Sequence, residues 1–460
     1  MATPIPGPQW QSDGGVGAVA AAGGLHLYQL ALHERYGPVV RFQLPGAGRG
    51  GAVSVADPVL LEATAHVNKR PAKLFEFLAP LCEAGNLQVL DAEEHGPWRR
   101  LLLSVLAGRP SHERHFAGFT ALVTDLADRW AEQAGRAHVS LQKDLTSLSL
   151  RMICEYALGD AATSDIVDPD RVTAAFENVL VEHLGRSEPL SGGQGGADSL
   201  AYLRATVDRI IAAYRRPGRP VRGDRSDLIG ALLAAGERPA RIRDTVMVTM
   251  LAAHHTTGVA VSWALHLLGR HPDVAARVAD ELDRVLGERA APDYADLRRL
   301  TYLDMVLKES MRLYPPGPYG AREATEDFVL GGEGESEGEG GGSQYEISAG
   351  TTIFYPFWAI HMNPAHWPDP GSFRPERFTP EAVAARPRFA YVPFGLGPRS
   401  CEGAGLAMVE AELMLAVLLK RFRFRPVPGH EVTPVERFVL WAADDIRMTV
   451  TPRGLSHGAT

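Results

Sequence analysis

The feature that most constrains the fold is a long apolar stretch that runs from Val246 to Leu268. It is long enough to span a membrane, but its centre, residues 254–257, reads His-His-Thr-Thr, and these polar side chains would be costly in lipid. We therefore expect a buried helix that crosses a large protein core. A chain of 460 residues, 45% of them hydrophobic and spread along its length, can bury such a helix in a single globular unit.

Helical periodicity dominates the rest of the chain. Apolar residues recur at three- and four-residue spacing in five further segments, at 24–37, 113–134, 198–216, 273–288 and 302–314. Runs typical of strands are short and few, at 37–45, 51–56, 351–356 and 446–452. The pattern predicts a mainly α fold with small β-sheets.

Two segments differ in composition from the rest. Residues 1–24 are expected to form a flexible N-terminal tail, and they lack the basic start and the strongly apolar run of a signal peptide or a membrane anchor. Residues 331–344 are rich in Gly and Glu, and we expect a loop insertion that joins two short strands. Residues 25–460 would then form one domain.

Charge and cysteine content narrow the class of protein. The net charge of −8 disfavours a nucleic-acid binder, whose affinity would come from clustered Lys and Arg. The three cysteines, Cys82, Cys154 and Cys401, are an odd number scattered through a long chain, which is not typical of a disulfide framework. These features predict a soluble enzyme in the cytoplasm.

Cys401 lies between a glycine-rich turn and an apolar helix, in the segment FGLGPRSCEGAGLAMVEAEL. First-turn amides and the helix dipole would stabilise a thiolate there, and Arg399 adds positive charge. Such a thiolate can be a nucleophile, with His361 or His366 as a candidate base, or the ligand of a soft metal centre. The structural alternative is a small buried hydrophobic residue.

The pattern Phe394-x-x-Gly397-x-Arg399-x-Cys401-x-Gly403 resembles the haem-binding loop of the cytochrome P-450 monooxygenases. The resemblance implies haem b, iron protoporphyrin IX, bound between the long central helix and the cysteine-loop helix. Cys401 would be the thiolate ligand of the iron, Phe394 would pack beside the sulfur, and Arg399 would pair with a haem propionate. Gly397 would allow close backbone approach, and Gly403 belongs to the same cofactor-binding loop.

Further motifs match the family in the expected order. Glu309 and Arg312 form a Glu-x-x-Arg pair on one helix face, and Arg377 in FRPERF would be their third partner in a structural role. Buried carboxylates need donors of the arginine type, and the resemblance assigns the remaining propionate contacts to His95, Arg99 and Arg322. Trp98 would pack on the same edge of the haem.

The oxygen-side helix departs from the family pattern. Where members carry Ala/Gly-Gly-x-Asp/Glu-Thr-Thr, this chain has Ala252, Ala253, His254, His255, Thr256 and Thr257. The threonine is retained, but the glycine and the acid are replaced. We interpret His255 as a protonatable relay that acts with Thr256 and Thr257, because imidazole titrates near neutral pH. Glu177 or Glu182 would be its salt-bridge partner.

A histidine at this place resembles the sterol 14α-demethylase branch of the family. The segment FEFLAPLCEAGN echoes that branch only in part, so we expect a different apolar substrate, from specialised metabolism. Residues 190–200, LSGGQGGADSL, are expected to form the flexible part of a lid. The candidate walls of the substrate pocket are Phe75, Phe77, Leu78, Ala252, Ala253, Thr257, Pro318 and Tyr319.

The resemblance implies a monooxygenase that activates O2 and hydroxylates or demethylates an apolar small molecule. The sequence has no flavin- or nicotinamide-binding signature, so electrons would come from a separate ferredoxin with its reductase or from a flavodoxin-like protein. Basic residues would dock this donor, namely Arg99, Arg100, Arg109 and Arg399. The alternatives are a non-hydroxylating oxidation such as ring coupling or a peroxygenase reaction, sterol 14α-demethylation, and a haem sensor or carrier without turnover.

Overall fold

The computed structural model describes residues 3–47, 51–135, 138–159, 167–183, 196–215, 227–331, 344–437 and 439–453. The α-helices in these ranges are α1 (Val16–Ala22), α2 (Leu25–Tyr36), α3 (Pro58–Ala63), α4 (Ala92–Leu106), α5 (Arg109–Gln133), α6 (Leu141–Leu158), α7 (Pro169–His183), α8 (Gly196–Tyr214), α9 (Leu228–Ala234), α10 (Pro239–Arg270), α11 (Pro272–Leu286), α12 (Thr301–Leu313), α13 (Phe357–His361), α14 (Pro380–Ala384) and α15 (Ala404–Arg421). Short 3-10 helices are η1 (Ala72–Leu81), η3 (Tyr294–Arg299), η4 (Pro375–Phe378), η5 (Arg388–Ala390) and η6 (Gly397–Arg399).

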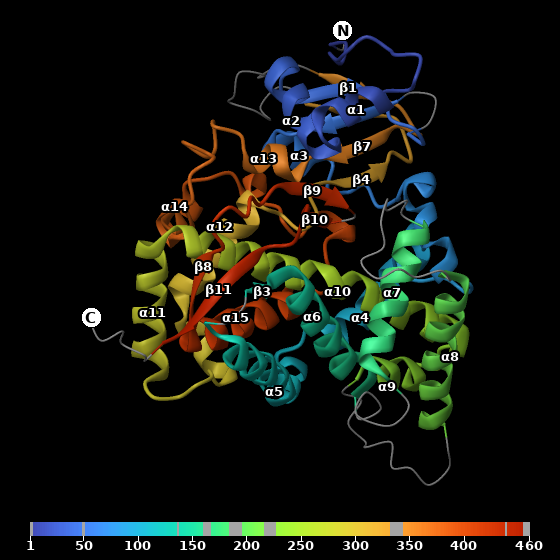
Figure 1. Cartoon of the computed structure of the whole chain (residues 1–460). Coiled ribbons are helices and arrows are strands. Elements are labelled where there is room, and N and C mark those ends of the chain that lie inside the picture. Colours follow the sequence, from blue (N-terminus) through green and yellow to red (C-terminus); the bar gives the residue numbers. More distant parts are fainter. Residues whose placement is uncertain are drawn as a thin grey trace.

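The strands are short, as the sequence predicts. They are β1 (Val39–Phe42), β2 (Ala52–Val55), β3 (Val139–Ser140), β4 (Gly320–Glu323), β5 (Phe328–Leu330), β6 (Tyr345–Ile347), β7 (Thr352–Tyr355), β8 (Phe422–Pro426), β9 (Pro434–Arg437), β10 (Val439–Ala442) and β11 (Arg447–Pro452). Among the described strands, the largest sheet has the order β1-β2-β7-β4, and the others are β3-β11-β8, β10-β9 and β5-β6. The four-stranded sheet lies at one end of the molecule with α1 and α2 (Figure 1). The prediction of a mainly α fold with small sheets is confirmed.

The long apolar stretch forms the central part of α10, which crosses the middle of the molecule (Figure 1). Most of its side chains from Val246 to Leu268 are buried in the main hydrophobic core. In the part of the chain that the structure describes, no helix has both the length and the apolar character needed to span a bilayer.

A glycine allows α6 to pack directly against α10. A Cβ atom on Gly258 would lie 2.6 Å from both the Leu145 carbonyl oxygen and the Thr146 amide nitrogen of α6, which is closer than any real contact. Because the obstacle is backbone, no side-chain movement could relieve it. Gly258 therefore fixes how closely α6 approaches the turn of α10 that carries Thr256 and Thr257.

Three predicted segments lie partly or wholly outside the described residues. The strands that flank the Gly/Glu-rich segment, β5 and β6, pair with each other, but residues 332–343 between them are not described. Of the predicted lid at 190–200, only its end from Gly196 is described, as the start of α8. The predicted N-terminal tail includes α1, and the Pro6 carbonyl accepts a hydrogen bond of 2.8 Å from the Arg41 amide.

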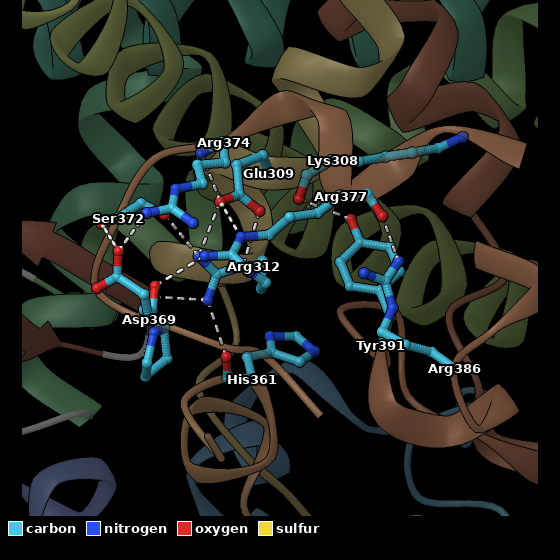
Figure 2. Close-up of polar contacts among 11 residues, drawn as sticks. Lys308, Glu309, Arg312, His361, Asp369, Ser372, Arg374, Arg377, Arg386 and Tyr391 are labelled. Atoms are coloured by element: carbon cyan, nitrogen blue, oxygen red, sulfur yellow. Dashed lines mark hydrogen bonds and ion pairs between the residues drawn. The ribbon is translucent and has the colours of Figure 1, made fainter. Parts of the chain in front are cut away.

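A buried ion pair anchors the C-terminal half of the chain. Glu309 and Arg312 on α12 are fully buried, and Arg312 donates to both carboxylate oxygens of Glu309 at 2.7 and 2.8 Å. Figure 2 shows Arg312 between Glu309 and the end of α13 at His361. The remaining donors of Arg312 bond to the backbone carbonyl oxygen of His361 and to those of Pro370 and Ser372 in the segment that follows α13.

All five N–H groups of the Arg312 guanidinium are therefore used. Glu309 also accepts from the Arg374 backbone amide at 2.9 Å and lies 3.3 Å from Arg377 Nε. One arginine thus joins α12 to the chain that leads into η4, and the third partner is the residue that the sequence predicts.

His361 in this network is held neutral, which makes stability depend on pH. Burial, and then the charge of Arg312, lower the pKa of His361 to about 3, and its Nε2 accepts a hydrogen bond of 2.9 Å from the Val392 amide. The unfolded chain protonates histidine near pH 6.5, so protons bind preferentially to the unfolded state between pH 6.5 and about 3.

We expect the free energy of unfolding to fall as the pH is lowered through this window. Replacing His361→Gln should remove its share of the loss, about 2 kcal/mol between pH 6.5 and 5, as measured by urea unfolding at both pH values. Above pH 7 the difference between wild type and variant should stay constant. Equal losses in both proteins would contradict this explanation.

Candidate cofactor site

The turn before Cys401 is set by glycines and closed by one backbone hydrogen bond. The Cys401 amide donates to the Phe394 carbonyl oxygen at 2.8 Å. Gly395 and Gly397 have φ angles of +72° and +64°, a region that favours glycine. A Cβ atom on Gly397 would lie 2.2 Å from the Ala65 carbonyl oxygen, so only glycine allows the turn to contact the end of α3. This geometry places the Cys401 thiol just before Gly403, the N-cap of α15.

Cys401 lies deep inside the protein, yet its surface is accessible because it faces an internal cavity. The cavity lies between α10 and α15, and most of its wall is aliphatic or carries only hydroxyl groups. The helical residues that line it are Leu102 and Leu106 of α4, Ile153 of α6, Thr245, Val248, Thr249, Ala252, Ala253, Thr256 and Thr257 of α10, and Leu406, Ala407 and Glu410 of α15. Gly403 also lines it, and a Cβ atom there would meet no atom within 4 Å.

Without a bound metal ion, the protein favours the protonated thiol of Cys401 over the thiolate. Burial raises the pKa of Cys401 to about 11, while the Gly403 amide and the charges of Arg99 and Arg70 oppose this effect. The sequence predicts a stabilised thiolate at the helix N-terminus, and this expectation fails because desolvation outweighs the nearby donors. A coordinating metal ion would remove the proton, since metal-bound thiols are deprotonated.

A cluster of four arginines and one histidine lies beside the cysteine loop, next to residues that line the cavity. It consists of Arg322, Arg399 and His95, which are buried, and Arg70 and Arg99, which are partly buried. Burial, and then the charge of Arg322, lower the pKa of Arg70 to about 9 and that of Arg399 to about 10. The pKa of His95 falls to about 4, chiefly by burial and then by four arginine charges, so His95 is neutral at pH 7. Because the four arginine charges repel each other, the cluster requires anions.

Glu402 is the acid that offsets the charge of this cluster most directly. It forms an ion pair with Arg99, which also donates to the Ser400 carbonyl oxygen at 2.6 Å. Arg399 donates hydrogen bonds to the backbone of two neighbouring loops, at the carbonyl oxygens of Asn68, Leu87 and Leu90. Arg99 is partly buried, Arg399 is buried, and both are bonded within the protein, which disfavours their predicted role in docking an electron donor.

Several polar atoms of the cluster lack partners among the described residues. They are Nε of Arg70, Nε of Arg322, both ring nitrogens of His95 and Nε1 of Trp98. Buried donors without partners are rare, and each costs about 1–3 kcal/mol. A planar apolar group with two carboxylates would satisfy the donors and fill the cavity, while its iron would meet the Cys401 sulfur. The residues present therefore fit haem.

On the opposite wall, α10 presents small and hydroxyl-bearing side chains to the cavity. Ala252, Ala253, Thr256 and Thr257 all line it. The Thr256 hydroxyl donates to the Ala252 carbonyl oxygen at 2.9 Å, so toward the cavity it offers only acceptor lone pairs.

The two histidines of this turn lie elsewhere. His254 and His255 are buried, their rings are stacked 4.0 Å apart, and His255 meets Trp441 edge-on at 5.2 Å. Neither lines the cavity. The predicted relay role of His255 stays a prediction, and of its two candidate partners Glu177 lies on α7, while the side chain of Glu182 is outside the described residues.

Other residues predicted for the pocket are not brought to the cavity. Leu78 packs in the main core, and Tyr319 donates to Glu436 at 2.5 Å, away from the cavity. Phe75 lies under the Arg70 guanidinium at 4.5 Å, and Pro318 is also absent from the cavity wall. The side chain of Phe77 is outside the described residues.

The nucleophile alternative is not supported by the positions of its candidate bases. His361 is buried beside Arg312, and His366 precedes the buried Trp367 in the segment after α13. Neither lines the cavity that holds Cys401.

Sequence reasoning missed Arg70, Glu402 and Glu410. Arg70 belongs to the short basic run Asn68-Lys69-Arg70, and Glu402 follows Cys401 directly. Glu410 has the clearest signal, because it is an acid four residues after Leu406 and four before Met414 on the buried face of an otherwise apolar helix.

Comparisons with known proteins agree with this geometry. Residues 5–450 match the family profile described as cytochrome P450. The chain superimposes on a crystal structure of the cytochrome P450DA heme domain with a TM-score of 0.81 and 25% sequence identity, over 98% of this chain and 97% of that one.

Three curated relatives come from Streptomyces. Cyclooctatin synthase of Streptomyces melanosporofaciens is 37% identical over 58% of this chain and 56% of its own length, so the match spans little more than half of that relative. Cyclooctat-9-en-7-ol 5-monooxygenase of the same organism is 31% identical over 75% of this chain and 73% of its own. Pentalenene oxygenase of Streptomyces avermitilis is 29% identical over 80% and 81%.

Proposed function

Since the chain belongs to the cytochrome P450 family and is a haem-dependent monooxygenase, we propose that it oxidises a cyclic hydrocarbon of the terpene type, or an alcohol derived from one, in specialised metabolism. The observation that carries this proposal is the aliphatic wall above Cys401, formed by side chains such as Val248, Ala252 and Leu106. Such a wall favours an apolar substrate. The names of the relatives support the proposal, because they specify pentalenene and cyclooctat-9-en-7-ol.

The residues proposed to hold haem are those around the cysteine loop. Cys401 would bind the iron through its sulfur, Arg70, Arg322 and His95 would hold the propionates, and Gly403 would leave room for the ring. When bound, haem supplies the reductive activation of O2, with thiolate ligation favouring cleavage of the O–O bond. The chain itself contributes a mostly apolar cavity and the Thr256 and Thr257 hydroxyl groups, which would orient water there.

The family requires O2 and an electron donor. We propose that the donor is a separate ferredoxin with its reductase, or a flavodoxin-like protein. We also propose a cytoplasmic location, supported by the absence of disulfides among the three cysteines, all of which are described.

Two finer assignments remain predictions. Sterol 14α-demethylation rests on the histidine in the α10 turn, and the relatives reported above are named for other substrates. A non-hydroxylating oxidation, such as ring coupling or a peroxygenase reaction, would use the same site. Product analysis with labelled O2 separates these outcomes, because hydroxylation places one labelled oxygen atom in the product.

Spectral titration of the purified holoenzyme tests the substrate class. Cyclic terpene hydrocarbons and their monoalcohols should displace the water bound to iron and shift the Soret band toward the high-spin position. Sterols and linear fatty acids serve as the comparison ligands. If only sterols produce the shift, the terpene proposal fails and the demethylase assignment gains support.

Thr256 provides a test of the oxygen side. Replacing Thr256→Val keeps the shape of the side chain but removes its acceptor oxygen, so water and reduced oxygen would lose a hydrogen-bond partner in the cavity. We expect about tenfold or greater loss in product formed per O2 consumed, with the excess released as hydrogen peroxide. Thr249→Val, about two turns earlier on the same wall, is the matched control. Full coupling in the Thr256 variant would show that this hydroxyl is not needed.

A further inference from the structure

Glu410 is a carboxylic acid in the wall of the cavity. The reaction of the family does not by itself explain why an acid stands at this position. It lies on α15 with 2% of its surface exposed and faces the cavity together with Thr256 and Thr257. Its carboxyl group forms a hydrogen bond with the Thr257 side chain. Its second oxygen, Oε1, has no partner among the described residues.

No described cation compensates a charge on Glu410. Burial raises the pKa of Glu410 to about 8, and the hydrogen bond from Thr257 lowers it only in part. An ionised carboxylate without a cation or a full set of donors would be costly in this apolar wall. The group therefore carries a proton at neutral pH.

The other groups of the cavity wall cannot fill this role. Residues 252–257 of α10 include no acid, and the Thr256 hydroxyl already donates its hydrogen bond to the Ala252 carbonyl oxygen. Glu402, the other described carboxyl group on the wall, is already engaged in an ion pair with Arg99. Glu410 is thus the described cavity residue that can both hold and release a carboxylic proton.

We propose that Glu410 is the proton donor of this cavity and acts through the Thr257 hydroxyl group, in place of the acid that residues 252–257 of α10 lack. The proton moves from the carboxyl oxygen to Thr257 Oγ1, and the Thr257 hydroxyl gives its own proton to a water molecule in the cavity. Water entering from solvent returns a proton to the carboxylate. The inference rests on the proposed monooxygenase function, because the reduction of O2 consumes protons.

The chain offers a matched control two residues further along α15. Burial, and then the charge of Asp304, raise the pKa of Glu412 to about 8 as well. Glu412 does not line the cavity, and the charge of Lys308 opposes the rise of its pKa. Glu410→Gln and Glu412→Gln therefore remove the same group from the same helix, on the cavity face and away from it.

Infrared difference spectroscopy of the holoenzyme tests the protonation and the position of Glu410. At pH 7 we expect a protonated-carboxyl band that shifts in deuterium oxide, shifts again when imidazole binds in the cavity, and disappears in Glu410→Gln. The imidazole-sensitive band should persist in Glu412→Gln. A band that survives in Glu410→Gln, or a Glu410 band that does not respond to imidazole, overturns the proposal.

Turnover with a surrogate ferredoxin and its reductase tests the proton transfer. Glu410→Gln should lower the product formed per O2 consumed by about tenfold or more, Glu410→Asp should restore part of it, and Glu412→Gln should resemble wild type. Wild-type coupling in Glu410→Gln overturns the proposal but leaves the monooxygenase assignment intact. If the wild type oxidises none of the substrates, the proposed function fails, and the infrared result alone decides whether Glu410 is the protonated acid of the cavity.

Discussion

Replacing Cys401→Ser is expected to abolish the Soret band that thiolate-ligated haem shows in its reduced, carbon-monoxide-bound state. Serine has nearly the same shape as cysteine, so the turn closed by the Phe394 carbonyl oxygen should survive. What changes is the donor atom, because a hydroxyl group is a far weaker and less polarisable ligand for iron than a thiolate. The loss of the band should be complete, with no detectable product.

The matched control is Cys82→Ser. Cys82 is half-buried at the end of η1 and does not line the cavity. This variant should keep the full thiolate band. Circular dichroism of both variants would establish that they fold. Retention of the band in a folded Cys401→Ser protein would refute the assignment of Cys401 as the ligand.

Replacing Glu309→Ala is expected to be the most destabilising change of a single polar side chain in this protein. Arg312 would lose both bonds to the carboxylate and remain charged in the core. Removing one partner of a buried pair costs about 3–5 kcal/mol, a large part of the roughly 5–15 kcal/mol by which a domain is stable. Urea unfolding should show a much lower midpoint, and expression at growth temperature should fall.

Arg374→Ala provides the comparison at the surface of the same network. Its side chain is half-exposed and pairs with Asp369 at 2.5 Å, while only its backbone amide contacts Glu309. Exposed pairs contribute about 0–1 kcal/mol, so this variant should unfold close to wild type. Similar losses in the two variants would mean that the pair on α12 does not carry the stability attributed to it.

Local patterns predicted a large part of the fold and of the site. The apolar run of α10, the glycine turn before Cys401 and the three-residue spacing of Glu309 and Arg312 are each determined within one helix or turn. Their physical causes, helical periodicity and backbone torsion, act over a few residues. The helix positions could therefore be predicted to within a few residues at their ends.

The features that sequence reasoning missed are made by segments far apart in the chain. The cation cluster combines Arg70 from the loop before η1 with Arg322 from β4, and no spacing brings them together. Sequence reasoning predicted a relay at His255 of α10 and missed Glu410, the carboxyl group that α15 brings to the cavity wall. The prediction of a stabilised Cys401 thiolate failed for the same reason, because the burial that raises the pKa of Cys401 depends on the whole fold.

The contact at Gly258 limits how this enzyme can acquire new substrates. Since the two crossing backbones already touch there, α10 cannot slide along α6 to enlarge or reshape the chamber. Variation in the reactions of related chains, or of variants selected in the laboratory, must then come from side chains that face the chamber, such as Val248 and Leu106. The close contact at Gly258 thus constrains the backbones of α6 and α10, whereas the side chains that line the cavity can change without disturbing that contact.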